Sequence, residues 1–203
     1  LFKRGEIIEA LRPNIYDPVE GTTIADAEVE RKNRRTKLVD VKWKTEDDKE
    51  LIISTTRPEL ICACGVVVVH PDDARYKHLI GKHAILPVPV NGREEKVEIR
   101  THPSVKSDFG SGLLMVCSCG AQEAVSVFRE VGLTPLLAID LEGCMTEISG
   151  PLSGMKVKDA RAEIINYLDE NNLIDSITEK EQEVPVSERG KNPVEIILLK
   201  EYY

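Results

Sequence analysis

Hydrophobic and polar positions alternate along several short stretches, and this two-residue period predicts β-strands. The cleanest alternation runs from Val39 to Lys44, and a polar turn then leads into Leu51–Ile53, which predicts an antiparallel hairpin. A second hairpin is predicted around Asn91-Gly92, a dipeptide that favours the two-residue type I′ turn. Uninterrupted apolar runs at 65–69 and 113–117 predict strands that are buried on both faces.

Two longer segments, 157–168 and 121–131, carry the spacing of an amphipathic helix, and Gly132 is placed to end the second. A shorter helix is predicted over 2–11, ended by Pro13. The remaining predicted strands are 25–30, 136–139, 174–183 and 195–199. Many short strands with few helices predict a mixed α+β fold, with a barrel-like mixed β-sheet core and peripheral helices.

Composition narrows the class of protein. A chain of 203 residues, 41% of them hydrophobic, is long enough to bury the core of one domain. Its formal net charge of −8 argues against a protein that coats nucleic acid non-specifically. No apolar run approaches membrane-spanning length and no signal-peptide pattern opens the chain, so we expect a cytoplasmic protein. The chain begins at Leu1 without an initiator methionine, which suggests a piece of a longer protein.

Five cysteines without a secretory signal suggest free thiols in a reducing compartment. Four of them form two C-x-C pairs, Cys62 with Cys64 and Cys117 with Cys119. Within a strand this spacing places both sulfur atoms on one face, so a four-thiolate metal site is one alternative. The other is a set of buried small hydrophobic residues, because structural zinc sites usually space their cysteines by two to four residues. We predict the second alternative, with no metal and no cofactor.

Two polar stretches lie at the ends of apolar strands, and we expect them to meet in one pocket. The first is Ser54-Thr55-Thr56-Arg57-Pro58-Glu59, which follows Leu51–Ile53. The second is Asp108-Phe109-Gly110-Ser111-Gly112, which precedes the run at 113–117. Hydroxyl groups, a guanidinium and bare glycine backbone at strand ends can all reach a ligand.

One dense basic run, Arg31-Lys32-Asn33-Arg34-Arg35, stands out in this acidic chain. It is either a solvated turn or a patch that contacts phosphates. The residues of the run do not decide between these interpretations.

Taken in order, the motifs resemble the editing domain inserted in class I aminoacyl-tRNA synthetases of the valyl, isoleucyl and leucyl group. The resemblance rests first on Thr55–Glu59 and Asp108–Gly112, which belong to the two polar stretches. The other matching segments are Ile24–Glu30, Val69–Lys82 and Pro193–Ile196. It spans almost the whole chain, and the archaeal-like valyl members match best. It implies the editing-domain fold, with a stem at 1–22, a core at 23–184 and a returning stem strand at 185–203.

The resemblance implies hydrolysis, because the synthetic signatures of the family, H-I-G-H and K-M-S-K-S, are absent. A hydrophobic pocket only weakly rejects a substrate that differs by one added hydroxyl, and this enzyme group is the standard example of that limit. Threonine attached to tRNA(Val) must therefore be removed in a second, polar pocket. There Thr55, Thr56 and Arg57 would be catalytic. The threonine hydroxyls would orient the attacking water, and Arg57 would pair with a phosphate or with an acid of the site. The substrate-binding residues would be Glu59, Asp108, Phe109, Gly110, Ser111, Gly112, Cys117, Ala121 and Ala124. The residues in contact with tRNA would be Arg31, Lys32, Arg34 and Arg35.

Ala121 and Ala124 depart from the family pattern. Family members carry two aspartates at this spacing, in the first turn of the helix after the Gly-x-Gly strand, and these acids hold the α-ammonium group of the substrate. Alanine cannot pair with an ammonium ion, so the resemblance implies impaired or altered editing. Leu60 also replaces a threonine that is common after the glutamate. The family's zinc-knuckle cysteines are absent too, and Tyr16-Asp17-Pro18 and Ser187–Gly190 stand in their places.

The main hypothesis is a hydrolase domain that deacylates Thr-tRNA(Val), and threonyl-adenylate as well, with the tRNA 3′ end delivered by the rest of a parent synthetase. The first alternative is a non-catalytic module that binds the acceptor end of tRNA, favoured by the missing acids and the basic run. The second is a domain retained only for structure. Isoleucyl or leucyl specificity is the runner-up within the main class. We expect the fragment to be monomeric.

Overall fold

The computed structural model describes the backbone of residues 2–202 and the side chains of residues 3–121, 124–200 and 202. The strands are β1 (Glu9–Asp17), β2 (Thr22–Thr23), β3 (Val29–Thr45), β4 (Glu50–Thr55), β5 (Cys64–Val69), β6 (His83–Ile85), β7 (Lys96–Thr101), β8 (Leu113–Cys117), β9 (Ile174–Ser187) and β10 (Glu195–Tyr202). The α-helices are α1 (Gln122–Glu130) and α2 (Val157–Glu170). Short 3-10 helices are η1 (Phe2–Arg4), η2 (Asp26–Glu28), η3 (Pro58–Ala63), η4 (Lys77–Leu79) and η5 (Glu147–Leu152). The predicted mixed α+β class is confirmed.

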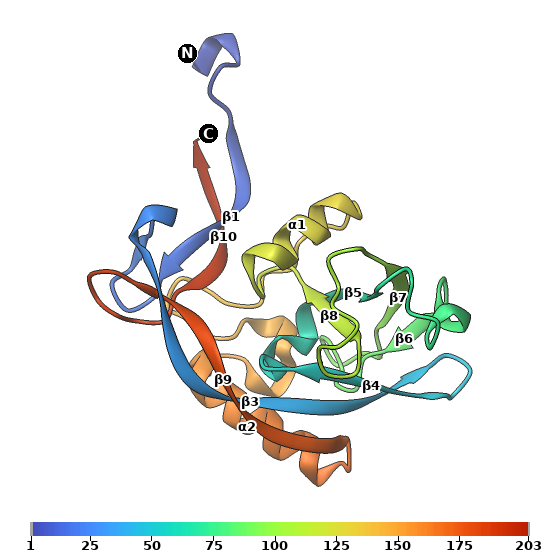
Figure 1. The fold of residues 1–203 in the computed structure, drawn as a ribbon. Coiled ribbons are helices and arrows are strands. Elements are labelled where there is room, and N and C mark those ends of the chain that lie inside the picture. Colours follow the sequence, from blue (N-terminus) through green and yellow to red (C-terminus); the bar gives the residue numbers. More distant parts are fainter. Residues whose placement is uncertain (1, 203) are drawn as a thin grey trace.

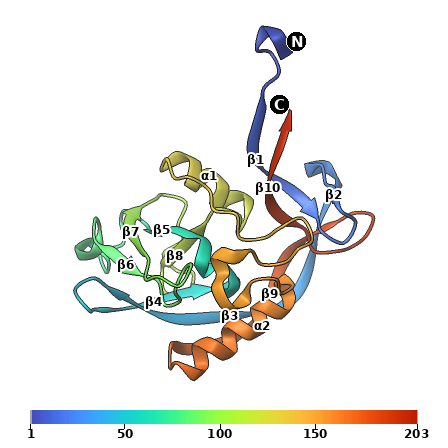
Figure 2. The ribbon, with the colours of Figure 1, turned by 180° about the vertical axis from the view of Figure 1, so that it is seen from behind.

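The long strand β3 organises the main sheet, whose strand order is β4-β3-β6-β7-β5-β8, with β9 paired to β3 as well. Its first part pairs with β9, from Val29 opposite Ser187 onward, and its last part pairs with β4. The register with β9 shifts between Asp40 and Val41, which marks an irregularity at the changeover. The sheet therefore curls around the body of the molecule, with α2 packed against one side (Figures 1 and 2).

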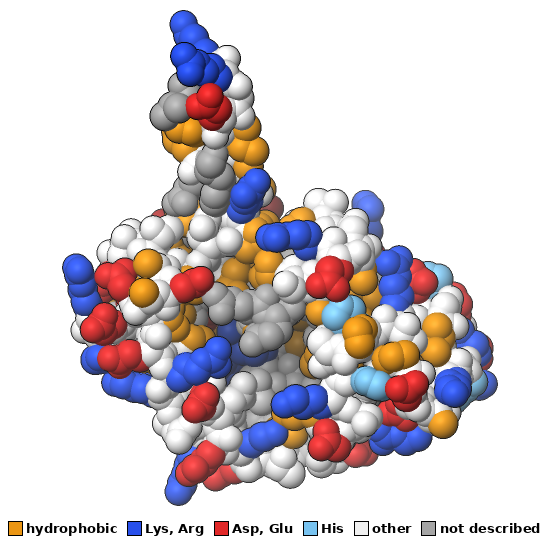
Figure 3. All heavy atoms as spheres, turned by 45° about the horizontal axis from the view of Figure 1, so that its top comes forward, with side chains coloured by type: hydrophobic (Ala, Val, Ile, Leu, Met, Phe, Trp, Pro, Cys, Tyr) orange, Lys and Arg blue, Asp and Glu red, His pale blue; other side chains and the backbone are white. Residues whose placement is uncertain are grey.

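A separate three-stranded sheet has the order β10-β1-β2. β1 and β10 form a two-stranded arm that projects from the body, with β1 beginning and β10 ending at its far end (Figure 1). In the space-filling view the arm stands clear of the body and exposes hydrophobic side chains (Figure 3). The most exposed of these include Leu11 and Tyr202, at 63% and 68%.

The predicted N-terminal helix is wrong beyond Arg4, because β1 starts at Glu9 and passes through Pro13. Pairing with β10 overrides the helical spacing of the local sequence. At Pro13 the other edge of β1 has no partner among the described residues, since β2 reaches only Tyr16 and Asp17. Proline is tolerated on such an open edge, where its missing N–H breaks no ladder.

Asp17 joins the base of the arm to the chain that follows β9. Its buried carboxylate accepts hydrogen bonds from the Ser187 hydroxyl at 2.7 Å and the Asn192 amide at 3.2 Å. It also accepts the backbone N–H groups of Val19 and Glu20. Burial alone would raise the pKa of Asp17, but these donors, the Ser187 hydroxyl foremost, lower it below the usual value. The chain around Asp17 and the segment 187–192 are thus held together by hydrogen bonds.

The core has one large cluster and one small cluster. α2 contributes Val157, Ala160, Ile164 and Leu168 to the large cluster, as its predicted apolar face requires. The small cluster lies between α1 and the outer strands, and contains Val66, Val68, Val105, Val116, Val127 and Phe128. Gly65 is essential to this packing, because a Cβ there would collide with the Phe128 ring. No helix in the described part of the chain is long and apolar enough to cross a membrane.

Most of the other predicted elements are confirmed, including both hairpins, the helices and the buried strands. Asn91 and Gly92 both have positive φ, 49° and 72°, as a type I′ turn demands. Three predictions need correction. The basic run 31–35 lies within β3 and is not a turn; 26–28 is the short helix η2; and 136–139 is irregular except for a single bridge at Ile139.

Candidate functional site

The two predicted polar stretches do meet, and Ser54 joins them. Its hydroxyl accepts the backbone N–H of Ser111 at 3.0 Å and donates to Asp40 Oδ1 at 2.5 Å. The Ser176 hydroxyl donates to the other oxygen of Asp40 at 2.6 Å. One carboxylate thus links β3, β4 and β9 to the Asp108–Gly112 loop. A polar node of this kind is rigid because each group in it has a partner.

The loop is shaped by its two glycines. Gly110 has φ 54°, and a Cβ there would collide with Ser54. Gly112 has φ 85°, and a Cβ there would lie 2.5 Å from the Arg75 guanidinium. Tyr76 holds the loop from outside by donating its hydroxyl to the carbonyl oxygen of Ser111 at 2.6 Å. Glycine is therefore needed at both positions for the conformation of the turn itself.

Phe109 lies at the tip of this loop and is half-buried, beside an exposed Asp108. It belongs to neither hydrophobic cluster. The Lys180 ammonium of β9 lies 4.0 Å from the centre of its ring, a cation–π contact. The ring is thus a partly open apolar surface next to a positive charge, which suits contact with a ligand better than core packing.

Arg57 lies in a chain of ion pairs whose glutamates are buried and whose arginines are half-buried. Its Nε donates to Glu59 at 2.6 Å, and a terminal nitrogen donates to Glu195 of β10 at 2.8 Å. Arg161 of α2 approaches Glu59 from the other side, through two hydrogen bonds of 2.8 and 3.0 Å. Two arginines and two glutamates therefore alternate and balance in charge, and they connect the Thr55–Glu59 segment to α2 and to the arm.

Burial and pairing act in opposite directions on these groups. Burial would raise the pKa of the fully buried Glu59, but Arg57 and then Arg161 lower it, so the carboxylate stays ionised. Burial would lower the pKa of Arg57, but Glu195 and Glu59 raise it above its usual value. A guanidinium held by two carboxylates is fixed in position, and both of its partners come from this chain.

The two threonines are placed differently. Thr55 is buried, and its hydroxyl oxygen accepts the backbone N–H of Arg57 at 3.0 Å. Thr56 is half-buried and lines an open groove of about 600 Å³ between β3 and α2. We call this the β3–α2 groove; its lining residues are Arg35, Thr36, Lys37, Thr56, Pro58, Lys158, Arg161, Ala162 and Ile165. Only Thr56 of the three predicted catalytic residues faces this open space.

Cys117 lies at the end of β8, directly opposite Cys64 of β5. A hydrogen bond with Cys64, together with burial, raises the pKa of the Cys117 thiol well above its usual value. Burial also raises the pKa of Cys62 to about 12 and that of Cys119 to about 11. All four cysteines are buried, as predicted. The raised pKa values keep Cys62, Cys117 and Cys119 as thiols rather than thiolates at neutral pH. Among the described side chains, no three acids, histidines or cysteines converge as ligands for a metal ion.

Ala121 and Ala124 lie at the start of α1, as the resemblance implies. Ala121 is the exposed N-cap, with extended φ and ψ of −160° and 163°, and its side chain offers no capping hydrogen bond. Ala124 is half-buried and packs against the small hydrophobic cluster. A carboxylate would therefore be solvated at Ala121 and partly desolvated at Ala124.

The basic run does not form one patch. Because side chains alternate along a strand, Arg31 and Arg35 lie on one face of β3, while Lys32 and Arg34 lie on the other. Arg34 donates to the carbonyl oxygen of Lys191 at 3.4 Å. Of the run, only Arg35 lines the β3–α2 groove. The alternative of a solvated turn is thus excluded, and the predicted phosphate contacts divide between two faces.

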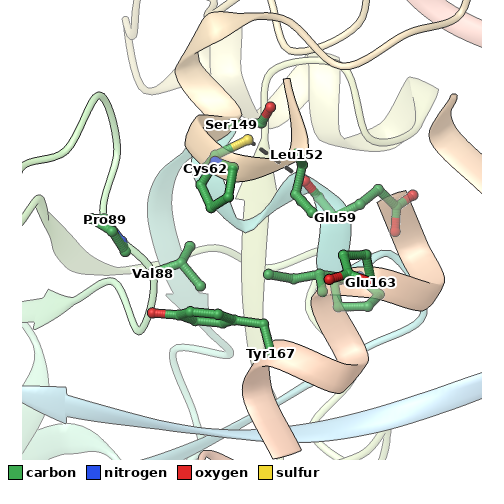
Figure 4. Close-up of a pocket in the computed structure, with 11 residues that line it drawn as sticks. Glu59, Cys62, Val88, Pro89, Ser149, Leu152, Glu163 and Tyr167 are labelled. Atoms are coloured by element: carbon green, nitrogen blue, oxygen red, sulfur yellow. Dashed lines mark hydrogen bonds between the residues drawn. The ribbon is translucent and has the colours of Figure 1, made fainter. Parts of the chain in front are cut away.

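A second pocket, of about 510 Å³, is lined by residues of η3, η5 and α2 and is mainly apolar (Figure 4). Val88, Leu152 and Tyr167 contribute to its lining, while Glu59 and Glu163 supply carboxyl groups. Glu59 is the only predicted site residue among those that line it, and its carboxylate is already paired with two arginines.

Sequence patterns left several residues of the site unrecognised. Asp40 and Ser176 are ordinary polar positions in alternating strands, and only the pairing of β9 with β3 brings them together. Arg161 occupies an unremarkable helix position. Ser54, in contrast, belongs to the first predicted polar stretch and lies at the end of β4.

The curled sheet and its few helices are consistent with the editing-domain fold of class I aminoacyl-tRNA synthetases. No protein-family model matches the chain. Over its whole length, however, it is similar to one segment of valine–tRNA ligases. It is 42% identical to the valine–tRNA ligase of Aeropyrum pernix, 43% to that of Nanoarchaeum equitans and 38% to that of Rickettsia typhi. The chain spans 24%, 26% and 25% of the lengths of these relatives.

Proposed function

We propose that this chain is an editing domain that hydrolyses threonine from mischarged tRNA(Val), as part of a valine–tRNA ligase that acts in the cytoplasm. The observation that carries the proposal is the match of the entire chain to one segment of valine–tRNA ligases. In the reaction, water adds its oxygen to the ester carbonyl carbon, the bond to the ribose oxygen breaks, and threonine and a free ribose hydroxyl leave. Threonyl-adenylate is a second expected substrate.

The geometry supports roles for the predicted residues. Thr56 is the threonine open to solvent, so it is the one proposed to orient the attacking water. Arg57 is held by Glu59 and Glu195, which suits the predicted pairing with an acid of the site and a role in fixing the strand end that carries Thr56. Phe109, half-exposed beside Lys180, is proposed to stack against the terminal base, because aromatic rings recognise unstacked bases in this way.

The activity is expected to be weak, because Ala121 and Ala124 supply no carboxylate for the α-ammonium group of the substrate. Loss of one charged hydrogen bond costs about 1.5–3 kcal/mol, or roughly 10- to 150-fold in rate if it acts only in the transition state. Editing would then rely on Thr56, Arg57 and the loop alone.

A deacylation assay with radiolabelled Thr-tRNA(Val) tests the proposal, with Val-tRNA(Val) as the substrate that must survive. We expect slow hydrolysis of the threonyl ester, and faster hydrolysis by a variant that carries both Ala121→Asp and Ala124→Asp. No acceleration over buffer by either protein would refute the hydrolase.

The two alanines also favour a second candidate, a module that holds the acceptor end of tRNA without chemistry. In that case unacylated tRNA would bind, while neither the original chain nor the double aspartate variant would hydrolyse the ester. Absence of tRNA binding would remove this candidate.

A further inference from the structure

The second pocket, shown in Figure 4, has a lining that suits one class of small molecule, and we call it the η3–α2 pocket. Its walls are mostly apolar, with Val88, Leu152 and Ile164 among the side chains that line it. Thr56, which opens into the β3–α2 groove, is not among the described residues that line it. The η3–α2 pocket is therefore distinct from the space that the proposed catalytic threonine faces.

The charge of the η3–α2 pocket is negative, because two glutamates and no cation are found among the described residues of its lining. Glu59 is already neutralised by its two arginines. Glu163 is exposed and forms no ion pair with any side chain that the structure describes. Its neighbours on the helix surface, three and four positions away, are not cationic: they are Asp159, Ala160, Asn166 and Tyr167. Glu163 therefore leaves an uncompensated negative charge at the edge of the pocket.

Two further side chains of the lining can receive a positively charged group. Tyr167 is half-buried and follows Glu163 by four positions, which places both side chains on the same side of α2, and an aromatic ring attracts a cation to its face. Ser149 is buried and donates its hydroxyl to the carbonyl oxygen of Thr146 at 2.6 Å, so the lone pairs of the hydroxyl oxygen can still accept a hydrogen bond. Figure 4 shows Tyr167 and Ser149 on opposite sides of the space.

We propose that the η3–α2 pocket binds a small amphipathic amine, with its ammonium group beside Glu163 and its hydrocarbon body among the apolar side chains. A carboxylate, an aromatic face and a hydroxyl oxygen, with no cation in the described lining, favour a cation over an anion. The apolar walls favour a hydrocarbon body over a small hydrated ion. A zwitterionic amino acid is disfavoured, because Glu163 repels its carboxylate.

The inference goes beyond the proposed function and does not depend on it. Thr56, Arg57 and Phe109, to which roles in ester hydrolysis are assigned, are not among the described residues that line the η3–α2 pocket. The deacylation assay and a binding experiment on this pocket therefore report on separate properties of the chain.

Titration of the nitrogen-15-labelled chain with 2-phenylethylamine, followed by heteronuclear NMR, tests the proposal. This amine is charged at pH 7, since an alkyl ammonium group titrates near the ordinary pKa of lysine. Two analogues of similar shape separate the effect of charge from that of the hydrocarbon: 2-phenylethanol is neutral, and 3-phenylpropionate is an anion.

Two matched variants test the position of the ammonium group. Glu163→Gln removes the charge proposed to hold it. Glu170→Gln removes the same charge from another exposed position of α2, which is not among the described residues that line the pocket. The two glutamates are about 10 Å apart along the helix axis, so at physiological salt the charge of Glu170 is largely screened from the proposed site.

We expect the amine to shift the backbone amide signals of η3, η5 and α2, with a dissociation constant on the order of 1 mM, because so small a ligand has a low ceiling on affinity. Glu163→Gln should weaken its binding about three- to fivefold and abolish the preference for the amine over the alcohol, whereas Glu170→Gln should leave the affinity almost unchanged. No binding by the original chain, or shifts confined to other elements, would overturn the proposal. Equal binding of the alcohol or the anion by the original chain, or equal weakening in the two variants, would overturn it as well.

Discussion

The N-terminus of α1 offers a sharp test, because Ala121 caps the helix without a capping group. Its extended backbone already has the N-cap geometry, its side chain is exposed, and the first hydrogen bond of the helix runs from the Val125 N–H to its carbonyl oxygen. The N–H groups of the first turn therefore have no helical carbonyl as acceptor. Ala121→Asp adds an acceptor for one of them and a negative charge at the positive end of the helix.

The expected gain follows from these two effects. An N-cap aspartate in place of alanine contributes about 1 kcal/mol, and its charge about 0.3–1 kcal/mol more at an exposed helix end. We expect Ala121→Asp to raise the free energy of unfolding by about 1–2 kcal/mol in urea denaturation at pH 7. For a domain of this size that corresponds to a rise in Tm of about 2–8 °C.

Two matched variants separate the effects. Ala121→Asn supplies the cap without the charge and is expected to gain only the first contribution, while Ala121→Val supplies neither and is expected to gain nothing. The difference between the aspartate and asparagine variants should disappear when the aspartate is protonated in acid. An aspartate variant no more stable than the valine variant would show that Ala121 is not the N-cap of α1. The asparagine variant also serves the deacylation assay, because it shares the cap but cannot form an ion pair with an ammonium group.

Three further predictions concern the frame around the site. Asp17→Asn should lower the stability of the protein at pH 7 and flatten the dependence of that stability on pH. In the folded protein the pKa of Asp17 lies below its ordinary value of 3.8, so Asp17 contributes stability at pH values above 3.8, and this contribution is lost as the pH falls through the folded pKa. Equal acid sensitivity of the two proteins, measured by denaturation from pH 6 to 2, would contradict this. Gly65→Ala should cost about 1–3 kcal/mol, because its methyl group would displace the Phe128 ring, and a neutral result in urea denaturation would show that the small cluster repacks freely. Glu195→Gln keeps the shape of the side chain but leaves Arg57 with one charged partner, so we expect the free energy of unfolding to fall by about 1.5–3 kcal/mol in urea denaturation. An unchanged denaturation midpoint would count against a stabilising role for the ion pair between Arg57 and Glu195.

Local patterns predicted the elements whose signal is local. The hairpin around Asn91-Gly92 and the helix α2 follow from turn chemistry and from helical spacing. The same reasoning failed over 2–11 and at the basic run 31–35, because those segments become strands only through partners far away in the sequence. Local spacing carries no information about such partners.

The same distinction between local and long-range sequence signals applies to the residues of the candidate site. The meeting of the two polar stretches could be predicted, because each lies at the end of a recognisable strand. The pairing of Arg57 with Glu195 could not, because it depends on how the arm folds back onto the body. The charge of the β3–α2 groove was also hidden, since its cations come from a strand and a helix that are distant in the sequence.

The pairing of β3 with β9, and of β1 with β10, also has a consequence for how the chain folds. Both ladders join segments from near opposite ends of the described chain, as in Val29 with Ser187 and Glu9 with Tyr202. Loop closure over such separations is slow, so we expect this domain to fold late and slowly compared with proteins rich in local contacts. During synthesis one long edge of β3 would stay unpaired until β9 leaves the ribosome, and an open strand edge invites association with other chains.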